Sequence, residues 1–346
     1  MSLEQLFSTA VDQKASDLHL IVGLKPYLRI DGKLVAIESE PQLTPAKSRE
    51  WVFALLDEEK KKRFEKDKDL DFSYEIKDGS RFRVNIHFEK GNIGLVARTI
   101  PVIVPSMEDL AMPPIVYDIV REPQGLILLT GPTGSGKSTS LAAMIDLINK
   151  ERAVHIITLE DPIEYLHKPD KSIIIQRELG EDLTNFNEGL KHALRQDPNV
   201  IMVGEMRDLD TIATTLTLAE TGHLVLATLH THDASQTIDR IVDVFPPHQQ
   251  NQIRMQLSLT LKAVISQHLL PSIQGGRIAV REVMLNSPAI GNIIRENKIA
   301  QLKTAIQTSA DKGMFTMEQD IKRLLKEGLI SEESAEIYMR YIPYKD

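Results

Sequence analysis

The chain contains no cysteine among its 346 residues. This absence excludes disulfides, cysteine-based zinc sites and thiol nucleophiles, and nothing in the sequence indicates an oxidising compartment. The chain also lacks an apolar run of roughly 20 residues, the length that a bilayer-spanning helix needs. Its N-terminus carries acidic and polar residues, unlike a targeting segment. We therefore expect a soluble cytoplasmic protein.

Positive charge is also in short supply, because 41 Lys and Arg stand against 49 Asp and Glu, for a formal net charge of −8. An acidic total argues against broad adsorption to nucleic acid or to an anionic membrane surface. We expect no nucleic-acid partner, and membrane association only through other proteins. The length is sufficient for two domains.

What the sequence does contain is an apolar run at 125–130 followed by GPTGSGKST at 131–139. The glycines of this stretch and the Lys-Ser pair after them have the spacing of a phosphate loop, whose backbone N–H groups wrap a β-phosphate. Lys137 would reach the β- and γ-phosphates, and the Ser138 hydroxyl would bind Mg²⁺. A helix should follow, with its N-terminal dipole pointing at the phosphate. The predicted nucleotide-binding residues are Gly131, Thr133, Gly134, Ser135, Gly136, Lys137, Ser138 and Thr139.

Proline-containing stretches at 100–105 and 112–114 separate two sequence patterns, so we place an interdomain linker at 101–115. Residues 1–100 are predicted to form a small α+β unit. Its expected elements are a strand at 18–21, a hairpin of 26–30 and 33–37 that turns at Asp31-Gly32, a charged helix at 48–66, and a second hairpin of 81–88 and 92–100.

Residues 116–270 change to an α/β pattern, and 271–346 are predicted to be mostly helical. Apolar runs without two-residue alternation are typical of a parallel sheet that is covered on both faces. These runs are 125–130, 154–159, 200–204 and 223–228, and helices are expected between them at 139–148, 185–194 and 208–221.

The second hairpin of the N-terminal unit predicts its own register. If Lys90-Gly91 is a two-residue turn, the apolar residues of both strands face one another and complete one apolar face. The same register places Arg83 directly opposite Arg98. Because like charges across a strand pair are destabilising, this pairing suggests an anion that both arginines serve. Solvated or carboxylate-paired arginines are the alternative.

Acidic residues follow two of the predicted core strands. Glu160, Asp161 and Glu164 follow the second strand, and Glu205 follows the third, where a Walker B acid stands. Ligands of an open α/β sheet bind at the carboxyl ends of its strands. One acid should help to hold Mg²⁺ and another should polarise the attacking water, and the sequence leaves open whether Glu164 or Glu205 is the base. The candidate metal ligands are Ser138, Glu160, Glu164 and Glu205, although Glu160 could instead be a helix cap or an ion-pair partner.

Two histidines, His223 and His230, flank the fourth core strand. Without cysteines or a helical His-Glu-x-x-His, a zinc site is not favoured. A neutral imidazole could instead report the state of a γ-phosphate through a hydrogen bond, so both are candidate catalytic residues. For the nearby His232, a core or capping role is the plain alternative.

Four stretches, GPTGSGKST, ITLEDPIEY, LRQDPNVIMVGEMRD and GHLVLATLHT, resemble in order and spacing the Walker A, Asp box, Walker B and His box of the secretion ATPase superfamily. Within it, the chain resembles the retraction ATPases of type IV pili. Extension and type II secretion ATPases usually carry further N-terminal domains and often a four-cysteine zinc motif. The stretch Ala289–Glu296, AIGNIIRE, is similar to the AIRNLIRE helix of retraction motors, with Gly291 in place of arginine.

The resemblance implies a PAS-like N-terminal domain and a RecA-like P-loop ATPase domain with a helical C-terminal region. It implies a homohexamer that hydrolyses ATP with Mg²⁺, with Arg83 and Arg98 reaching the nucleotide. It also implies an inner-membrane pilus platform protein, and in some systems an accessory retraction ATPase paralogue, as partners. We expect a pilus retraction motor at the inner face of the cytoplasmic membrane. The alternatives are a pilus assembly or accessory secretion ATPase, a RecA-like nucleic-acid motor, or a regulatory partner that binds nucleotide without hydrolysis.

Overall fold

The computed structural model describes residues 1–30, 32–101 and 103–341. Asp31 of the first predicted turn, Val102 of the predicted linker and the last five residues of the predicted C-terminal region lie outside the described residues. The chain divides into two compact units, Met1–Ile103 together with Glu164–Leu166, and the remainder from Val104 onward. Each unit has its own hydrophobic core.

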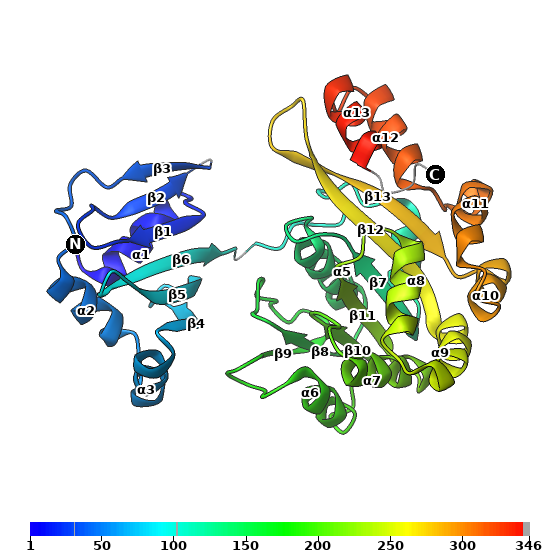
Figure 1. Ribbon diagram of the computed structural model, residues 1–346, viewed down its shortest axis with the longest axis horizontal. Coiled ribbons are helices and arrows are strands. Elements are labelled where there is room, and N and C mark those ends of the chain that lie inside the picture. The colour runs from blue at the N-terminus through cyan, green and yellow to red at the C-terminus, as the bar shows by residue number, and fades with distance from the viewer. Residues whose placement is uncertain (31, 102, 342–346) are drawn as a thin grey trace. The chain divides into compact units, whose positions relative to one another are not determined.

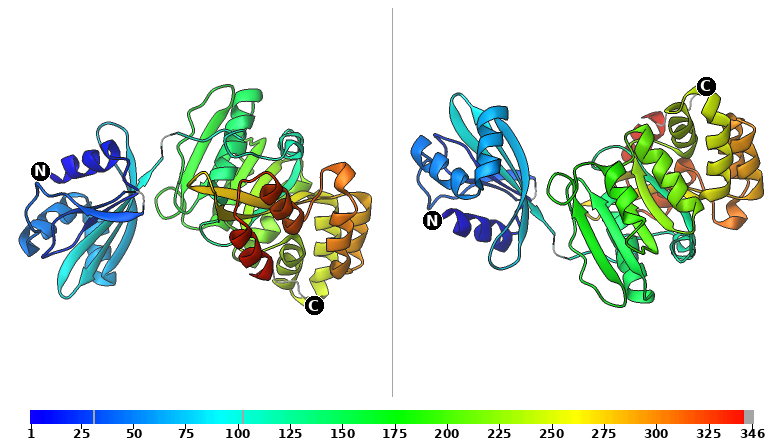
Figure 2. Two further views of the ribbon diagram at one scale, coloured as in Figure 1. Left: turned by 90° about the horizontal axis from the view of Figure 1, so that it is seen from above. Right: turned by 90° about the horizontal axis from the view of Figure 1, so that it is seen from below.

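The first unit is built on a six-stranded antiparallel sheet in the order β3-β2-β1-β6-β5-β4 (Figure 1). The helices of this unit pack on one face of the sheet (Figure 2), and their apolar side chains share one core with its strands. The elements are α1 (Leu3–Asp12), β1 (Asp17–Leu20), β2 (Tyr27–Ile30), β3 (Lys33–Ala36), α2 (Pro45–Ala54), α3 (Glu58–Asp67), β4 (Asp69–Glu75), β5 (Arg81–Glu89) and β6 (Asn92–Ile100).

The predicted register of the second hairpin is confirmed. Arg83 pairs with Arg98, and the apolar pairs fall as expected on the buried face. Lys90 and Gly91 both have positive φ, 49° and 78°, as a type I′ two-residue turn requires. The turn residues alone were therefore sufficient to fix which side chains share a face.

The single charged helix predicted at 48–66 is wrong, because two helices cover this stretch. Helix α2 ends at Ala54, and the side chain of Asp57 then accepts a hydrogen bond from the Lys60 backbone N–H and caps α3. An aspartate that bonds the backbone three residues on begins a new helix, since it satisfies an N–H group that lacks an intrahelical partner.

The second unit contains a seven-stranded sheet in the order β13-β12-β7-β11-β10-β8-β9. Neighbouring strands are parallel except for the antiparallel pair β12–β13. The elements are α4 (Pro114–Val120), β7 (Gly125–Thr130), α5 (Lys137–Glu151), β8 (His155–Glu160), β9 (Ile173–Glu178), α6 (Phe186–Ala193), β10 (Val200–Val203), α7 (Leu209–Glu220), β11 (Leu224–Leu229), α8 (Ala234–Asp243), α9 (Pro247–Thr260), β12 (Leu261–Pro271), β13 (Arg277–Leu285), α10 (Pro288–Arg295), α11 (Leu302–Gln307), α12 (Met317–Lys326) and α13 (Glu332–Tyr341).

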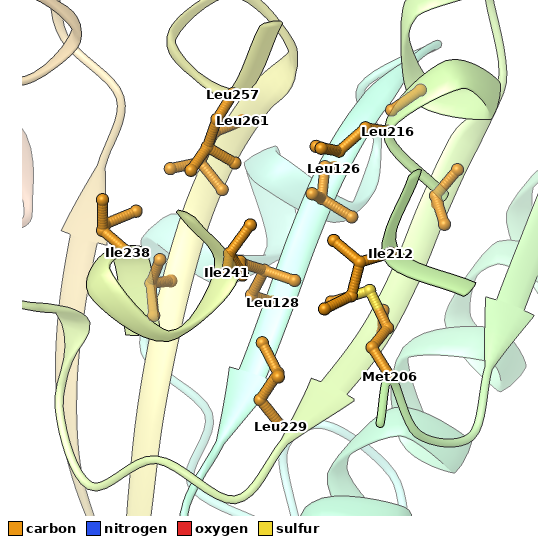
Figure 3. Close-up of a cluster of buried hydrophobic side chains, with 14 of the residues drawn as sticks. Leu126, Leu128, Met206, Ile212, Leu216, Leu229, Ile238, Ile241, Leu257 and Leu261 are labelled. Atoms are coloured by element: carbon orange, nitrogen blue, oxygen red, sulfur yellow. The ribbon is translucent and has the colours of Figure 1, made fainter. Parts of the chain in front are cut away.

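Both faces of the central strands β7, β8, β10 and β11 are buried, as the apolar runs without alternation predicted. On β7, Leu126 and Leu128 join the cluster formed with α7, α8 and α9 (Figure 3), whereas Ile127 and Leu129 join the cluster on the opposite face with α4 and α5. A strand that contacts helices on both sides needs apolar residues at every position, which explains its sequence. The predicted α/β fold class is confirmed.

The prediction that the chain is mostly helical from about Pro271 is wrong for residues 277–285. These residues form β13, which pairs with β12 at the edge of the sheet, and helices resume only at Pro288. Strands β9 and β12 were also not predicted. None of the helices in the described ranges combines the length and apolarity that a membrane span requires.

Glu282 on β13 is a buried acid that joins two helix N-termini. Its carboxylate accepts a hydrogen bond from the Ala234 N–H at the start of α8, at 3.0 Å, and another from the Met317 backbone at the start of α12. Burial raises the pKa of Glu282 to about 7, although these N–H groups favour the ionised form. Between pH 4.5 and about 7, the folded protein therefore holds a proton here that the unfolded chain has released.

We expect the free energy of unfolding of Glu282→Gln, relative to the wild-type protein, to be higher at pH 8.5 than at pH 5.5. The pKa of Glu282 is 4.5 in the unfolded chain and about 7 in the folded protein. Its contribution to the free energy of unfolding is therefore largest below pH 4.5 and is lost as the pH rises through about 7. Glutamine keeps an acceptor oxygen and never ionises, so its advantage should grow by roughly 2 kcal/mol between the two pH values. Urea unfolding at both pH values measures this. Glu59→Gln, at an exposed position of α3, controls for the lost charge, and a pH-independent effect of Glu282→Gln would contradict the prediction.

Candidate nucleotide-binding site

The glycine-rich loop connects β7 to α5. Gly131, Gly134 and Gly136 all have positive φ, at 143°, 78° and 84°. A Cβ at Gly131 would lie 2.2 Å from the carbonyl oxygen of Gln267, so the loop passes β12 at a distance that only glycine allows. Ser138 and Thr139 lie in the first turn of α5, so the loop ends on the N–H groups of a helix N-terminus.

Lys137, the first residue of α5, points its ammonium group back into the loop. Its Nζ donates to the carbonyl oxygens of Gly131 at 2.7 Å and Pro132 at 3.0 Å, and the residue is buried. The buried hydroxyl of Ser135 has no hydrogen-bond partner among the residues the structure describes. A cationic group and an unsatisfied donor within one loop, at a helix N-terminus, fit the binding of a phosphate.

Several predicted site residues lie at the carboxyl ends of the parallel strands, which is also where this loop begins. Glu160 ends β8, Glu205 follows β10 after one residue, and His230 follows β11. The close approach of β10 and β8 also depends on a glycine. A Cβ at Gly204 would lie 2.9 Å from the carbonyl oxygen of Leu159.

Glu205 is the centre of the charged contacts at this edge. Its carboxylate pairs with Nη2 of Arg207 at 2.8 Å and lies 3.3 Å from Nε2 of His230. Burial would raise the pKa of Glu205, but the hydrogen bond from Arg207 and the charges of His230 and Arg207 together lower it below its ordinary value. Glu205 is therefore ionised at neutral pH, as a base or a cation ligand must be.

Arg207 was not among the predicted site residues. It lies 3.9 Å from the carboxylate of Asp161 as well as bonding to Glu205, so it joins the stretch after β8 to the stretch after β10. Its signal in the sequence was its place two residues after Glu205, within the stretch that resembles a Walker B motif.

Glu160 is buried and accepts hydrogen bonds from two neighbouring side chains. Its Oε1 accepts hydrogen bonds from the Thr158 hydroxyl at 2.6 Å and from Nε2 of Gln176 at 3.0 Å. These bonds hold the carboxylate against β8 and β9, and its role as a metal ligand stays a prediction. Throughout residues 1–30, 32–101 and 103–341, no three His, Asp or Glu side chains gather closely enough to hold a metal ion alone. Mg²⁺ needs no such cluster, because it is usually held by one or two carboxylates together with phosphates and waters.

The predicted catalytic role of His223 is not supported by its position. It precedes β11, whereas His230 follows it, and this strand of six residues separates them by about 20 Å. Its Nδ1 lies 3.0 Å from the Leu218 carbonyl oxygen and 3.3 Å from the Thr221 hydroxyl, at the end of α7. His223 therefore lies at the amino end of β11, away from the loop, and its catalytic role stays a prediction.

The other predicted catalytic residues are Glu164, which is exposed, and two arginines of the first unit. Arg98 pairs through Nε with Asp17 at 3.0 Å, and its side chain is 70% exposed. Arg83 lies 3.9 Å from the carboxylate of Asp71 and is also exposed. Each arginine thus has a carboxylate neighbour, which was the alternative to a shared anion, and their predicted catalytic role stays a prediction.

Comparisons with known proteins match the chain over nearly its whole length. A family model described as "Type II/IV secretion system protein" matches residues 1–336. The "Type IV pilus retractation ATPase PilT" of Pseudomonas aeruginosa is 47% identical over 335 residues, which cover 97% of each chain. The "Twitching motility protein" of Neisseria gonorrhoeae is 44% identical and covers 96% of this chain and 89% of its own. A crystal structure described as "the Pilus Retraction Motor PilT and Bound ADP" has a TM-score of 0.93 at 44% identity, covering 99% of this chain and 98% of its own.

Proposed function

The chain belongs to the family of type II/IV secretion system proteins, and we propose that it is a hexameric, Mg²⁺-dependent ATPase that drives retraction of type IV pili. Relatives that match both units of the chain are ATPases or proteins of pilus retraction and twitching, so the chain is an ATPase of this type. The observation that carries the proposal is the agreement between this match and the phosphate loop, which lies at the same sheet edge as Glu205 and His230.

Within the site, the loop N–H groups and Lys137 would bind the phosphates of ATP. Mg²⁺ would neutralise phosphate charge when bound, and its holders would be the Ser138 hydroxyl and one of the acids Glu160, Glu164 and Glu205. Glu205 is ionised and fixed by Arg207, so it can accept a proton from a water that attacks the γ-phosphate. His230, at 3.3 Å from that carboxylate, would respond to the charge on Glu205 and on the phosphate.

We further propose that Arg83 and Arg98 supply positive charge to the nucleotide. The strand pair β5–β6 holds these residues directly opposite each other, and both side chains are exposed enough to change partners. An anion between the two guanidinium groups could accept hydrogen bonds from both.

We propose that the chain forms a homohexamer. This hexamer acts on an inner-membrane platform protein at the inner face of the cytoplasmic membrane. A nucleic-acid motor is less favoured because the chain is acidic overall. A non-hydrolysing partner is less favoured because the sequence keeps both acids that hydrolysis would use, Glu164 and Glu205.

Expression of the chain in a piliated but retraction-deficient strain tests the proposal. We expect pilus withdrawal and twitching to be restored, and the Lys137→Ala variant expressed at the same level to restore neither. Restoration of pilus assembly without withdrawal would favour the extension alternative. Phosphate release by the purified chain, with and without single-stranded DNA, separates the remaining alternatives.

A further inference from the structure

Gln267, a residue of β12, connects the glycine-rich loop to the rest of the second unit. Its Nε2 donates to the carbonyl oxygen of Ser135 at 2.7 Å. Its Oε1 accepts from the Ser140 hydroxyl at 3.0 Å and from Nε of Arg281 at 2.9 Å. Only 1% of the residue is exposed, so these partners replace water for both ends of the amide.

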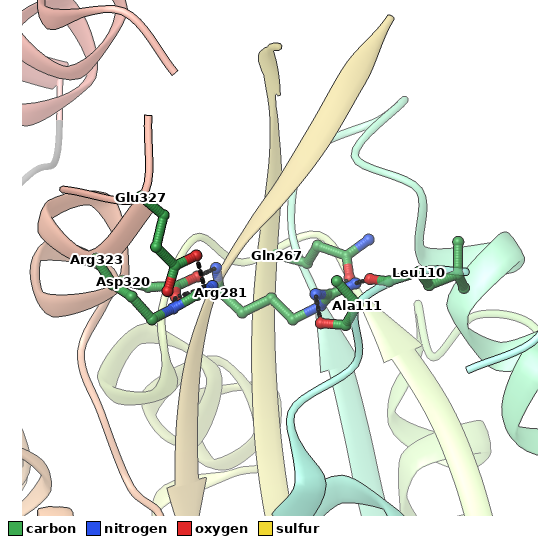
Figure 4. Close-up of polar contacts among 7 residues, drawn as sticks. All are labelled: Leu110, Ala111, Gln267, Arg281, Asp320, Arg323 and Glu327. Atoms are coloured by element: carbon green, nitrogen blue, oxygen red, sulfur yellow. Dashed lines mark hydrogen bonds and ion pairs between the residues drawn. The ribbon is translucent and has the colours of Figure 1, made fainter. Parts of the chain in front are cut away.

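Arg281 lies directly across from Gln267 in the β12–β13 pair and is also buried, at 3% exposed. Its two terminal nitrogens donate to the carbonyl oxygens of Ala111, at 3.2 Å, and Leu110, at 3.0 Å (Figure 4). These carbonyls belong to the stretch between the start of the second unit at Val104 and helix α4. Arg281 thus spans from this stretch to the amide that holds the loop.

The same β13 residue is also bonded to helix α12. Its backbone N–H donates to Asp320 on α12 at 2.8 Å, and Asp320 pairs with Arg323 at 2.8 Å. Burial lowers the pKa of Arg281 to about 10, while the negative charge of Asp320 opposes that shift. The guanidinium is therefore still charged at neutral pH, and its five N–H donors form a rigid fork.

The direction of the Gln267 amide is fixed by chemistry. Arg281 has only donors to offer, so the amide oxygen must face it, and the amide nitrogen is left to face Ser135. In a planar trans peptide, the carbonyl and the N–H of the next residue point in opposite directions. Holding the Ser135 carbonyl toward β12 therefore turns the Gly136 N–H away from β12, at the end of the loop that precedes α5.

We propose that Gln267 is a positioning residue that sets the peptide between Ser135 and Gly136 for phosphate binding, and that Arg281 orients Gln267. This rests on the proposed nucleotide site. Arg281 also donates to the carbonyl oxygens of Leu110 and Ala111. A shift of that stretch would therefore change the orientation of Gln267 and with it the nucleotide affinity. Neither residue touches the phosphates, so the effect is on how firmly nucleotide is bound.

Gln267→Glu is the first test, with ADP affinity and the ATP KM and kcat as readouts. The carboxylate keeps an acceptor for Ser140 and Arg281 but cannot donate to the Ser135 carbonyl, so two acceptors would face each other in a buried site. We expect ADP to bind about 5- to 100-fold more weakly, and the ATP KM to rise accordingly, as for a buried partner left unsatisfied. We expect kcat at saturating ATP to fall by less than about threefold. Gln267→Asn, whose shorter amide cannot reach the loop, should act in the same direction.

The matched control is Gln274→Glu, which makes the same substitution at an exposed position in the turn of the same hairpin. It should leave affinity, KM and kcat unchanged. The proposal is overturned if both Gln267 variants have a lower melting temperature but the wild-type KM. A residue with a purely structural role would give this result.

Arg281→Lys tests whether arginine acts through Gln267. Lysine keeps the charge but cannot bond Gln267 and both carbonyls at once. We expect weaker ADP binding in this variant, and no further weakening when it is combined with Gln267→Glu. Additive losses in the double variant would show that Arg281 does not act through Gln267. If Lys137→Ala still hydrolyses ATP, the nucleotide site itself is wrong. If Lys137→Ala is inactive but both Gln267 variants bind ADP normally, only the positioning role fails.

Discussion

Lys137→Ala is expected to abolish ATP hydrolysis, with a loss in kcat/KM of about 10³-fold or more. The Lys137 ammonium lies within the loop, 2.7 Å from the Gly131 carbonyl oxygen, where β- and γ-phosphates would bind. Alanine removes the positive charge that offsets the charge on these phosphates in the transition state. Phosphate release by the purified variant at saturating ATP and Mg²⁺ measures the loss.

The control for this variant is Lys150→Ala, which removes a lysine from the far end of the same helix. Lys150 pairs with Asp146 on the exposed surface of α5 at 2.6 Å, so its loss should cost less than about 1 kcal/mol in stability and leave hydrolysis intact. Hydrolysis at the wild-type rate by Lys137→Ala, with a normal melting temperature, would contradict the assignment of the loop.

Features that depend on short-range spacing could be predicted from the sequence. The phosphate loop and the start of the helix after it are adjacent in the chain, so one short motif indicates both. The same motif accounts for the positive φ of Gly131, Gly134 and Gly136. The register of β5 and β6 was fixed by its two turn residues. The buried parallel strands were evident because both of their faces are apolar.

Features that depend on distant pairing could not be predicted. Strand β12 begins at the residue after α9 ends, so no turn signal separates helix from strand. The partners Gln267 and Arg281 meet only because β12 and β13 form a hairpin at the edge of the sheet. The hydrogen bond from Gln267 to the loop joins residues that are 132 positions apart, and nothing local in the sequence indicates it.

The positions of His223 and His230 follow from chain direction, which the sequence does give. Parallel strands bind ligands at their carboxyl ends, and His223 precedes its strand whereas His230 follows it. Chain direction places the two histidines at opposite ends of β11, and the catalytic role of His223 stays a prediction. The same rule, applied to Arg207 after β10, would have included it in the predicted site.

Glu205→Gln is expected to lower kcat by about 10²- to 10⁴-fold while ADP affinity changes by less than about threefold. Glutamine has the same shape but cannot accept a proton or balance the charge of Arg207, its partner at 2.8 Å. The favoured assignment of Glu205 as the base rests on this contact and on His230 at 3.3 Å, because both keep the carboxylate ionised and fixed in direction. Single-turnover hydrolysis with separately measured ADP binding distinguishes lost chemistry from lost affinity.

Glu164→Gln must be measured beside it, because both acids follow strands of the same sheet and either could activate the water. Glu164 is exposed, so an effect on kcat in that variant alone would transfer the base role to it and leave Glu205 as a cation holder. A loss in both variants would indicate that one acid holds Mg²⁺ while the other accepts the proton, and Mg²⁺ titration then separates them, since excess Mg²⁺ restores only the variant that lacks the holder. Glu188→Gln at an exposed position of α6, which breaks an ion pair with Lys191, controls for the charge change and should hydrolyse ATP normally.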